Sequence, residues 1–284
     1  MPRGGGMKLF VSADIEGIGG VATWTQARVG GPEHKRARQW MTEEVNIAIE
    51  GALEGGLSEA LVCDAHGDAT NILWEELHPK ARLVTGWGPE LDMLLGIDDG
   101  FATVFLIGHH PGASARRGLL SHCFTRRILD CRFNGLPCNE GVIAAIQAGI
   151  HGIPIGLVSG QVELEEELRP TLPDFRFVPT KQGLFWQSAI LDPRAAVHRR
   201  MRAAAREAAE AIASGAGPEP FRPEPPLRLE MELSSVEAAA AVEGLEGVDR
   251  TGSARCLLAA DDARAFIRRF FKLLNILYAA KDTP

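Results

Sequence analysis

Carboxylate and imidazole side chains follow apolar segments at several places in this chain of 284 residues. Asp14 and Glu16 come directly after the apolar run 8–13. Side chains two residues apart on an extended strand point to the same side, so both carboxylates should face one pocket. Two carboxylates in one pocket repel each other unless a cation lies between them. The pair therefore indicates a metal site.

Three further segments place metal-ligand side chains at the end of an expected strand or the start of an expected helix: Asp64 with His66, His109 with His110, and Glu140. The carboxyl ends of parallel strands meet at one edge of a sheet, where functional groups converge. Asp14, Glu16, His66 and either His109 or His110 should therefore meet in one crevice. Asp64 is placed to orient a ligand histidine from behind. Oxygen and imidazole ligands without thiolates suit zinc, manganese or cobalt in a catalytic site.

Each of these features alone has a simpler explanation. An Asp-x-Glu at a strand end more often starts a loop, and a single histidine after a strand is usually only hydrogen-bonded. The metal interpretation depends on the combination, since three carboxylates and several histidines fall at sheet ends of one domain.

A dinucleotide site is one competing hypothesis. Gly17, Gly19 and Ala22 fit the pattern G-x-G-x-x-A after a strand. Asp14 and Glu16 would then lie beside a pyrophosphate, which is electrostatically unfavourable. The fingerprint also needs a helix that opens inside the motif, whereas the helical pattern here begins only near residue 32.

A thiol nucleophile is a second competing hypothesis. Cys123 follows His122, and Cys138 lies two residues before Glu140. Neighbouring anions raise a thiol pKa and so disfavour the reactive thiolate, and a cysteine is more often a small buried apolar residue. The five cysteines include no CxxC pair, so neither a disulfide framework nor a four-thiolate zinc site is expected.

The elements that must hold these residues alternate between strand and helix. Strands are expected over 8–14, 59–64, 103–108 and 153–160, with helices over 32–54 and 139–151 and a hairpin over 127–137. This order predicts an α/β fold, a mostly parallel sheet with helices on both faces, plus a smaller α+β part. The predicted division is a disordered lead-in over 1–6, a metal-binding catalytic domain over 7–180, and the smaller part over 181–284, which can be intertwined with the first.

Composition excludes several classes of protein. The formal net charge is −7, and the absence of a long basic run argues against a nucleic-acid partner. No apolar stretch is long enough to cross a bilayer, and residues 1–9 lack the apolar middle of a signal peptide. These observations predict a cytoplasmic protein without a membrane partner.

The ordered motifs resemble those of a known family, the two-zinc D-aminopeptidases of the dipeptide-permease operon type. The resemblance covers most of residues 7–160 and rests on five segments: Ser12-x-Asp14-x-Glu16-Gly17, Met41-Thr42-Glu43-Glu44-x-Asn46, Asp64-x-His66 followed by Leu77-His78-Pro79, Gly108-x-His110, and Ser121-His122 before the helix that opens with Glu140.

The resemblance implies a role for each matching position. Asp14 would bridge two metal ions, Glu16 and His66 would complete one site, and His110 with Glu140 the other. His122 matches a histidine that takes part in catalysis, whereas His109 matches no ligand. The resemblance also implies a ring-shaped homo-oligomer, with a decamer as the suggested order. The implied activity is removal of the N-terminal residue, including a D-amino acid, from a short peptide by means of two zinc ions.

One departure from the family pattern concerns substrate recognition. Gln161-Val162 replaces an acidic pair after the strand 153–160. If those acids recognise the substrate amine, the preference for D-amino acids is open while the metal chemistry is not. Separately, a protein that binds amino acids or peptides without turnover is kept as a non-enzymatic alternative.

Overall fold

The computed structural model describes residues 6–88 and 92–279, so residues 1–5 of the predicted lead-in lie outside the described residues. A seven-stranded sheet has the order β3-β2-β1-β4-β7-β8-β9. Its strands are β1 (Lys8–Ala13), β2 (Glu59–Asp64), β3 (Ala81–Val84), β4 (Phe101–His109), β7 (Ile155–Gln161), β8 (Arg176–Phe185) and β9 (Ser188–Leu191). All neighbours pair in parallel except β8 with β9. The nearly continuous apolar composition of the central strands suits a sheet covered on both faces.

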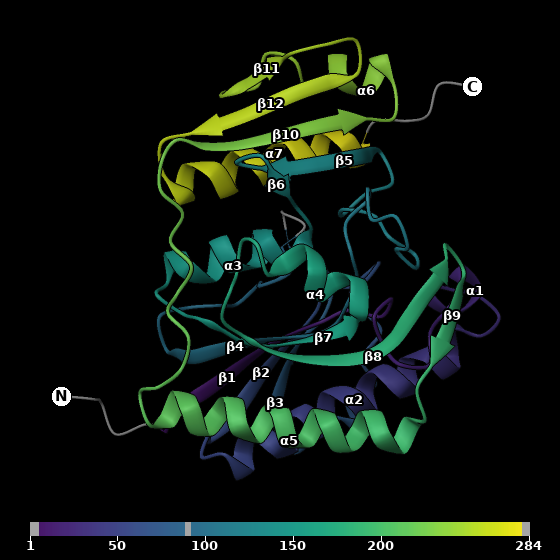
Figure 1. The fold of residues 1–284 in the computed structure, drawn as a ribbon, viewed down its shortest axis with the longest axis vertical. Coiled ribbons are helices and arrows are strands. Elements are labelled where there is room, and N and C mark those ends of the chain that lie inside the picture. The colour runs from purple at the N-terminus through teal and green to yellow at the C-terminus, as the bar shows by residue number, and fades with distance from the viewer. Residues whose placement is uncertain (1–5, 89–91, 280–284) are drawn as a thin grey trace.

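Helices cover the two faces of this sheet (Figure 1). On one face, α2 (His34–Glu54) packs against α5 (Arg194–Ala213). Their contact requires glycine, because a Cβ atom on Gly51 would lie 2.3 Å from the carbonyl oxygen of Arg202. On the other face lie α3 (Glu140–Ile150) and α4 (Val162–Leu168). The predicted fold class is confirmed.

A smaller antiparallel sheet has the order β11-β12-β10-β5-β6. Its strands are β5 (Ile128–Phe133), β6 (Leu136–Pro137), β10 (Leu227–Leu233), β11 (Val248–Arg250) and β12 (Arg255–Ala260), and α6 (Val236–Val242) and α7 (Ala263–Ala279) pack beside them. Along β10 the apolar side chains are buried and alternate with more exposed ones, as expected for a sheet with one wet face. Figure 1 shows α7 between this sheet and α3, and buried residues join them in one core.

A division of the chain at residue 180 does not coincide with the two sheets. The cut falls inside β8, and β8, β9 and α5 continue the first unit. The β5–β6 hairpin, from the first half of the chain, pairs instead with β10. The one-sided burial of β5 explains this placement, because such a strand needs a solvated face that the covered parallel sheet does not offer.

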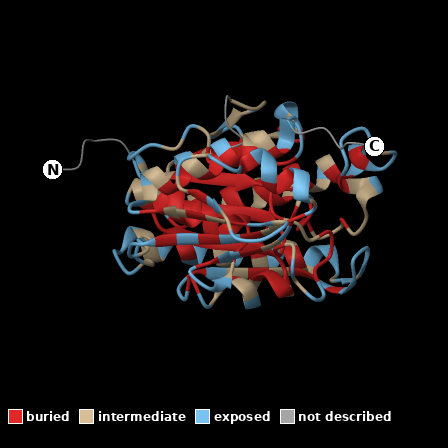
Figure 2. Ribbon diagram, turned by 90° about the horizontal axis from the view of Figure 1, so that it is seen from above, coloured by how far each residue is buried: buried red, intermediate tan, exposed pale blue. Residues whose placement is uncertain are grey.

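Short elements that periodicity does not indicate complete the fold: α1 (Trp24–Ala27) and the 3-10 turn η1 (Trp74–Glu76). Figure 2 shows that the buried residues concentrate in the sheet and on the inner sides of the helices. Among the described residues, no helix combines the length and the apolar character that a membrane span requires.

Candidate metal centre

The predicted ligand residues lie at the carboxyl edge of the parallel sheet. Ala13 at the end of β1 pairs with Asp64 at the end of β2 and with Ile107 near the end of β4, so the three strands stop at nearly the same level. Asp14 and Glu16 follow β1, His66 follows β2 and His110 follows β4. Glu140 comes from a different direction, as the first residue of α3, whose amino end is capped by the side chain of Asn139.

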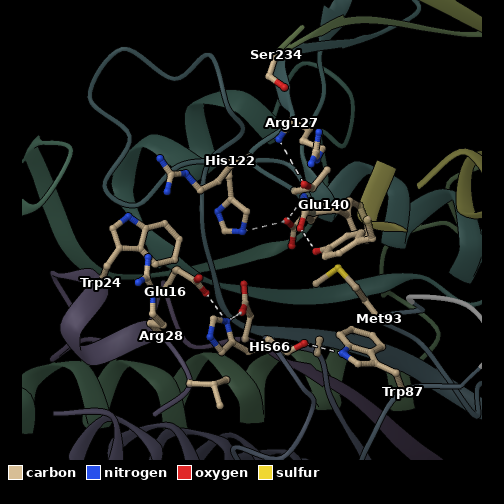
Figure 3. Close-up of a pocket in the computed structure, with 18 residues that line it drawn as sticks. Glu16, Trp24, Arg28, His66, Trp87, Met93, His122, Arg127, Glu140 and Ser234 are labelled. Atoms are coloured by element: carbon tan, nitrogen blue, oxygen red, sulfur yellow. Dashed lines mark hydrogen bonds and ion pairs between the residues drawn. The ribbon is translucent and has the colours of Figure 1, made fainter. Parts of the chain in front are cut away.

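Asp14 lies between two groups of these side chains. Its Oδ1 atom is 3.1 Å from Nδ1 of His66, and that same nitrogen is 2.8 Å from Oε2 of Glu16. Its Oδ2 atom is 3.5 Å from Nε2 of His110, which is 3.5 Å from Oε1 of Glu140. One carboxylate therefore faces both groups with a different oxygen. Figure 3 shows Glu16 and His66 on one side of the pocket and Glu140 and His122 on the other.

The potential ligand atoms are close enough to share metal ions. Those of Asp14, Glu16 and His110 all lie within 4.8 Å of one another, and so do those of His110, His122 and Glu140. His66 belongs to the first group through its contacts with Asp14 and Glu16. The second group brings His122 nearer to the ligand positions than the sequence predicts. The rings of His110 and His122 are stacked, with centroids 4.1 Å apart.

Backbone carbonyl groups orient all three imidazoles: Ala27 for His66 at 2.7 Å, Pro111 for His110 at 2.8 Å, and Leu120 for His122 at 2.9 Å. A carbonyl oxygen can only accept a hydrogen bond, so the ring nitrogen beside it carries the proton. The other nitrogen of each ring then faces the carboxylates, and it offers a lone pair when the imidazole is neutral. Such carbonyl contacts are the usual way in which a protein fixes the tautomer of a metal-binding histidine.

Asp64 acts on the loop and not on the histidine ring, which corrects the expectation from the sequence. Its carboxylate accepts hydrogen bonds from the backbone N–H groups of Asn71 and Ile72 and from the side chain of Asn71. The same Asn71 amide also donates to the carbonyl of His66 at 2.6 Å. Asp64 therefore fixes the backbone that carries His66, while the Ala27 carbonyl orients the ring.

The electrostatics of the cluster show strong mutual dependence. Burial, followed by the charge of Glu16, raises the pKa of Asp14 to about 8. Burial opposes the charged form of Glu140, but the imidazolium of His110 outweighs it and lowers the pKa of Glu140 to about 2. Burial likewise disfavours a charged His110, yet the Glu140 carboxylate raises the pKa of His110 to about 10. The carboxylates thus require positive charge beside them.

The donor atoms fit metal ions. Oδ2 of Asp14, Oε1 of Glu16 and Nε2 of His110 are buried, and each makes no hydrogen bond with the described residues. A buried polar atom without a hydrogen bond is costly unless another partner satisfies it. Nitrogen and oxygen donors of this kind suit zinc and related ions. When all three carboxyl groups are ionised they carry −3, which divalent cations would offset.

His109 takes no part in this arrangement, although the residue order alone left His109 and His110 as alternatives. Both of its ring nitrogens are without a hydrogen bond among the described residues, and burial lowers its pKa to about 4. Its ring is therefore a neutral buried group. His110 is the histidine that faces the carboxylates.

Lys181 is a functional residue that the sequence reasoning missed. This buried side chain of β8 donates hydrogen bonds to the carbonyl groups of Glu16, Ile18 and Val21. It therefore holds the loop that carries Glu16. The surrounding strand Arg176–Phe185 mixes buried and exposed positions, so the sequence does not indicate that this charge is buried or which loop it reaches.

The structure argues against a dinucleotide site at Gly17, Gly19 and Ala22. A Cβ atom on Gly17 would lie 2.0 Å from the carbonyl oxygen of His109, and one on Gly19 would lie 2.9 Å from the Glu44 carboxylate. These glycines allow the protein to pack on itself instead of exposing backbone to a phosphate. The helix that follows, α1, has only four residues.

The cysteines are equally unsuited to nucleophilic chemistry. All five are buried and free. Burial raises the pKa of Cys138, and a hydrogen bond with Cys131 together with burial raises that of Cys123 well above its usual range. A thiol with a raised pKa supplies little thiolate at neutral pH.

A cavity of about 740 Å³ opens onto the cluster. Glu16, His66, His122 and Glu140 line its inner end, and Trp24, Arg28, Trp87, Arg126 and Tyr278 are among the residues of its walls. Gln161 is fully buried and is not among the described residues that line the cavity. Val162 is likewise not among the described residues that line this cavity.

The fold is α/β, and its site gathers nitrogen and oxygen donors of the kind that bind zinc and related ions. The D-aminopeptidase family profile matches residues 7–271, and the chain belongs to this family.

Two relatives place the chain more closely. A D-aminopeptidase of Bacillus subtilis (strain 168) is 33% identical over 178 residues, which are 63% of this chain and 65% of the relative, so the match spans just under two thirds of it. The solved structure of the Zn-dependent D-aminopeptidase DppA from Bacillus subtilis, a self-compartmentalizing protease, superposes with a TM-score of 0.88. That match has 26% identity and covers 98% of this chain and 100% of the other.

Proposed function

We propose that this protein is a zinc-dependent aminopeptidase that removes the N-terminal residue, including a D-amino acid, from short peptides. The observation that carries the proposal is the position of Asp14, whose two carboxylate oxygens face His66 on one side and His110 on the other. Membership of the D-aminopeptidase family and the likeness to a zinc-dependent relative support the same activity.

Two metal ions are proposed, held by the residues that the sequence predicts. Asp14 would bridge them, Glu16 and His66 would complete one position, and His110 and Glu140 the other. When bound, zinc ions polarise a carbonyl group and lower the pKa of water, which is the chemistry that peptide hydrolysis needs. The carbonyl contacts of His66 and His110 favour this assignment, because they leave Nδ1 of His66 and Nε2 of His110 as the ligand atoms.

His122 is proposed to move a proton during the reaction. Its Nδ1 atom is tied to the Leu120 carbonyl, which leaves Nε2 facing the pocket at 3.9 Å from Oε1 of Glu140. Burial, followed by the charge of His110, lowers the pKa of His122, so the ring is neutral near pH 7. A neutral ring can accept a proton from water and deliver it to the leaving amine.

The test is hydrolysis of D- and L-alanyl p-nitroanilides before and after dialysis against a chelator. We expect measurable turnover, loss of activity on chelation, and recovery when zinc is added, with two equivalents of zinc in the active protein by elemental analysis. Unchanged activity in chelator would contradict the proposal. Binding of peptides without turnover by the zinc-loaded protein would favour a binding protein instead.

Assembly into a homo-oligomer is proposed from the relative described as self-compartmentalizing. The β8–β9 hairpin supports it, because this hairpin exposes large apolar side chains that a lone chain leaves in water: Leu184, Phe185, Trp186, Ile190 and Leu191. Light scattering on the purified protein measures the mass. A ring-shaped decamer and a cytoplasmic location remain predictions from the sequence.

A further inference from the structure

Acidic side chains line the inner end of the cavity, and basic side chains lie nearer its opening. The three acids at its inner end, Asp14, Glu16 and Glu140, are between 1 and 5% exposed. Two of the arginines in its walls, Arg28 and Arg126, are exposed at the opening. A peptide that enters with its N-terminal residue at the inner end therefore extends towards these cations.

Neither of these guanidinium groups has an anionic partner within residues 6–88 and 92–279. Some other exposed arginines of the protein do have one. Arg202, for example, binds Glu50 and Glu54, and Arg255 binds Glu232. The planar fork of a guanidinium fits a carboxylate with two parallel hydrogen bonds. Two such groups at one opening are therefore available to an anion from outside.

An aromatic wall fixes Arg126 relative to the reaction site. The guanidinium lies over the Trp186 ring, 5.7 Å from its centroid. Trp186 is 6.4 Å from Trp24, and Trp24 is 5.7 Å from His122, measured between ring centroids. Arg126 is thus stacked on a continuous surface that begins at the proposed proton carrier, which restricts its position more than solvent would.

Arg28 is fixed from the opposite direction. It follows α1, and the carbonyl of the preceding residue, Ala27, holds the imidazole of His66. Its backbone therefore moves with one of the proposed ligands. Figure 3 shows Arg28 close to Trp24, on the same side of the pocket as Glu16 and His66.

We propose that Arg28 and Arg126 bind the free C-terminal carboxylate of the substrate, so that the enzyme prefers short peptides with an unblocked carboxyl end. This inference rests on the proposed function and adds its substrate class. Arg28 and Arg126 are specificity-determining residues in this account, with no part in bond cleavage. Each residue of an extended peptide adds roughly 3.5 Å, so the carboxyl end of a short peptide would lie near the opening, whereas that of a long peptide would lie beyond it.

The experiment compares three peptides on the zinc-loaded protein: D-Ala-Gly-Ala as the free acid, the same peptide as its C-terminal amide, and D-Ala-Gly-Glu amide. A hydrogen-bonded charge contact is worth about 1.5–3 kcal/mol, so kcat/KM for the acid should exceed that for the first amide about 10-fold or more, mainly through KM. Arg28→Gln and Arg126→Gln should each reduce this ratio, because each lowers kcat/KM more for the free acid than for the amide. Arg255→Gln, outside the cavity, is the matched control and should keep the wild-type ratio.

The outcomes separate the two proposals. Failure to hydrolyse any of the three peptides would overturn the proposed function. Equal kcat/KM for the acid and its amide, with activity present, would overturn only the role of the arginines. If D-Ala-Gly-Glu amide had the same kcat/KM as D-Ala-Gly-Ala free acid, the opening would accept a side-chain carboxylate. That result would contradict the assignment to the C-terminal carboxylate. A ratio that neither arginine substitution changes would also contradict the proposal.

Discussion

The Nζ atom of Lys181 lies 2.5 Å from the carbonyl oxygen of Glu16 and 2.7 Å from that of Ile18, and it also donates to the carbonyl of Val21. The neighbouring residue on β8, Thr180, donates its hydroxyl to the carbonyl of Gly17 at 2.6 Å. Two successive residues of one strand therefore hold the loop that carries Glu16, although they lie about 160 positions further along the chain.

Replacing Lys181 by Met should destabilise the protein and weaken its hold on metal. Three buried carbonyl groups would lose their donor, and each unsatisfied group costs about 1–3 kcal/mol. Because the loop relaxes in part, we expect a loss of about 2–4 kcal/mol in the free energy of unfolding. Urea unfolding measures this loss, and a competition titration with a zinc chelator measures the affinity.

Lys8→Met is the matched control for that substitution. Lys8 forms an ion pair with Glu59 in which both side chains are largely exposed. Exposed pairs of this kind contribute about 0–1 kcal/mol. If Lys181→Met bound zinc as tightly as Lys8→Met does, the idea that β8 positions Glu16 would be wrong.

The buried carboxyl group of Glu44 should make stability depend on pH. Its Oε1 atom accepts a hydrogen bond from the Gly19 N–H at 2.9 Å. Burial raises its pKa to about 7, while the Gly19 hydrogen bond and the charge of Lys181 act in the opposite direction. The folded protein then binds this proton more tightly than the unfolded chain does. The contribution of Glu44 to the free energy of unfolding is therefore fully present below pH 4.5 and is lost as the pH rises through 7.

The measurement is urea unfolding of the wild type and of Glu44→Gln between pH 5 and pH 7. The wild type should lose about 2 kcal/mol relative to the variant over this range, since glutamine keeps the acceptor but does not titrate. The range stops at pH 7 because burial lowers the pKa of Lys181, which faces Glu44, to about 7. Glu75→Gln, at an exposed position, should follow the wild type. Parallel pH curves for wild type and Glu44→Gln would show that the carboxyl group is already charged at pH 5.

Much of the site could be predicted because its residues follow the ends of parallel strands. Asp14, His66 and His110 each follow a strand of one parallel sheet, and parallel strands bring their carboxyl ends together whatever their order. Glu140 was also a candidate from the sequence, but its place in the ligand set needed the resemblance, because it reaches the site from the first turn of α3.

Residues that complete the site from elsewhere could not be predicted in this way. Lys181 reaches the loop that carries Glu16, and Arg126 reaches Trp186, through the packing of β8 and of the loop before β5, and no local pattern encodes that packing. The β5–β6 segment was expected to form a hairpin. Its place in the second sheet, however, depends on pairing with β10, about 100 residues later. Local periodicity predicts an element and its buried face, and leaves open which distant strand it will join.

Removing His122 and removing Glu140 should have different effects. His122→Ala should keep near-normal zinc content and lose at least about 100-fold in kcat, the usual contribution of a positioned proton carrier. Glu140→Ala should lose both zinc and activity, because it takes away a proposed ligand. Elemental analysis and steady-state kinetics on both variants make the comparison. Loss of zinc from His122→Ala would instead make this histidine a ligand, which its place within 4.8 Å of the His110 and Glu140 ligand atoms allows.

Thiol reagents should leave the native enzyme active. Cys123, Cys131 and Cys138 are at most 3% exposed, and burial contributes to the raised pKa of each. Little thiolate forms at pH 7.5, so iodoacetamide should react slowly with the folded protein and rapidly once urea unfolds it. Mass spectrometry counts the labelled cysteines, and residual activity is measured on the same sample. Cys123→Ala should retain activity within a few-fold of wild type, because the chemistry does not pass through a thiol. Rapid inactivation that tracks labelling of Cys123 or Cys138, with zinc still bound, would restore the thiol as a candidate nucleophile and remove His122 from its proposed role.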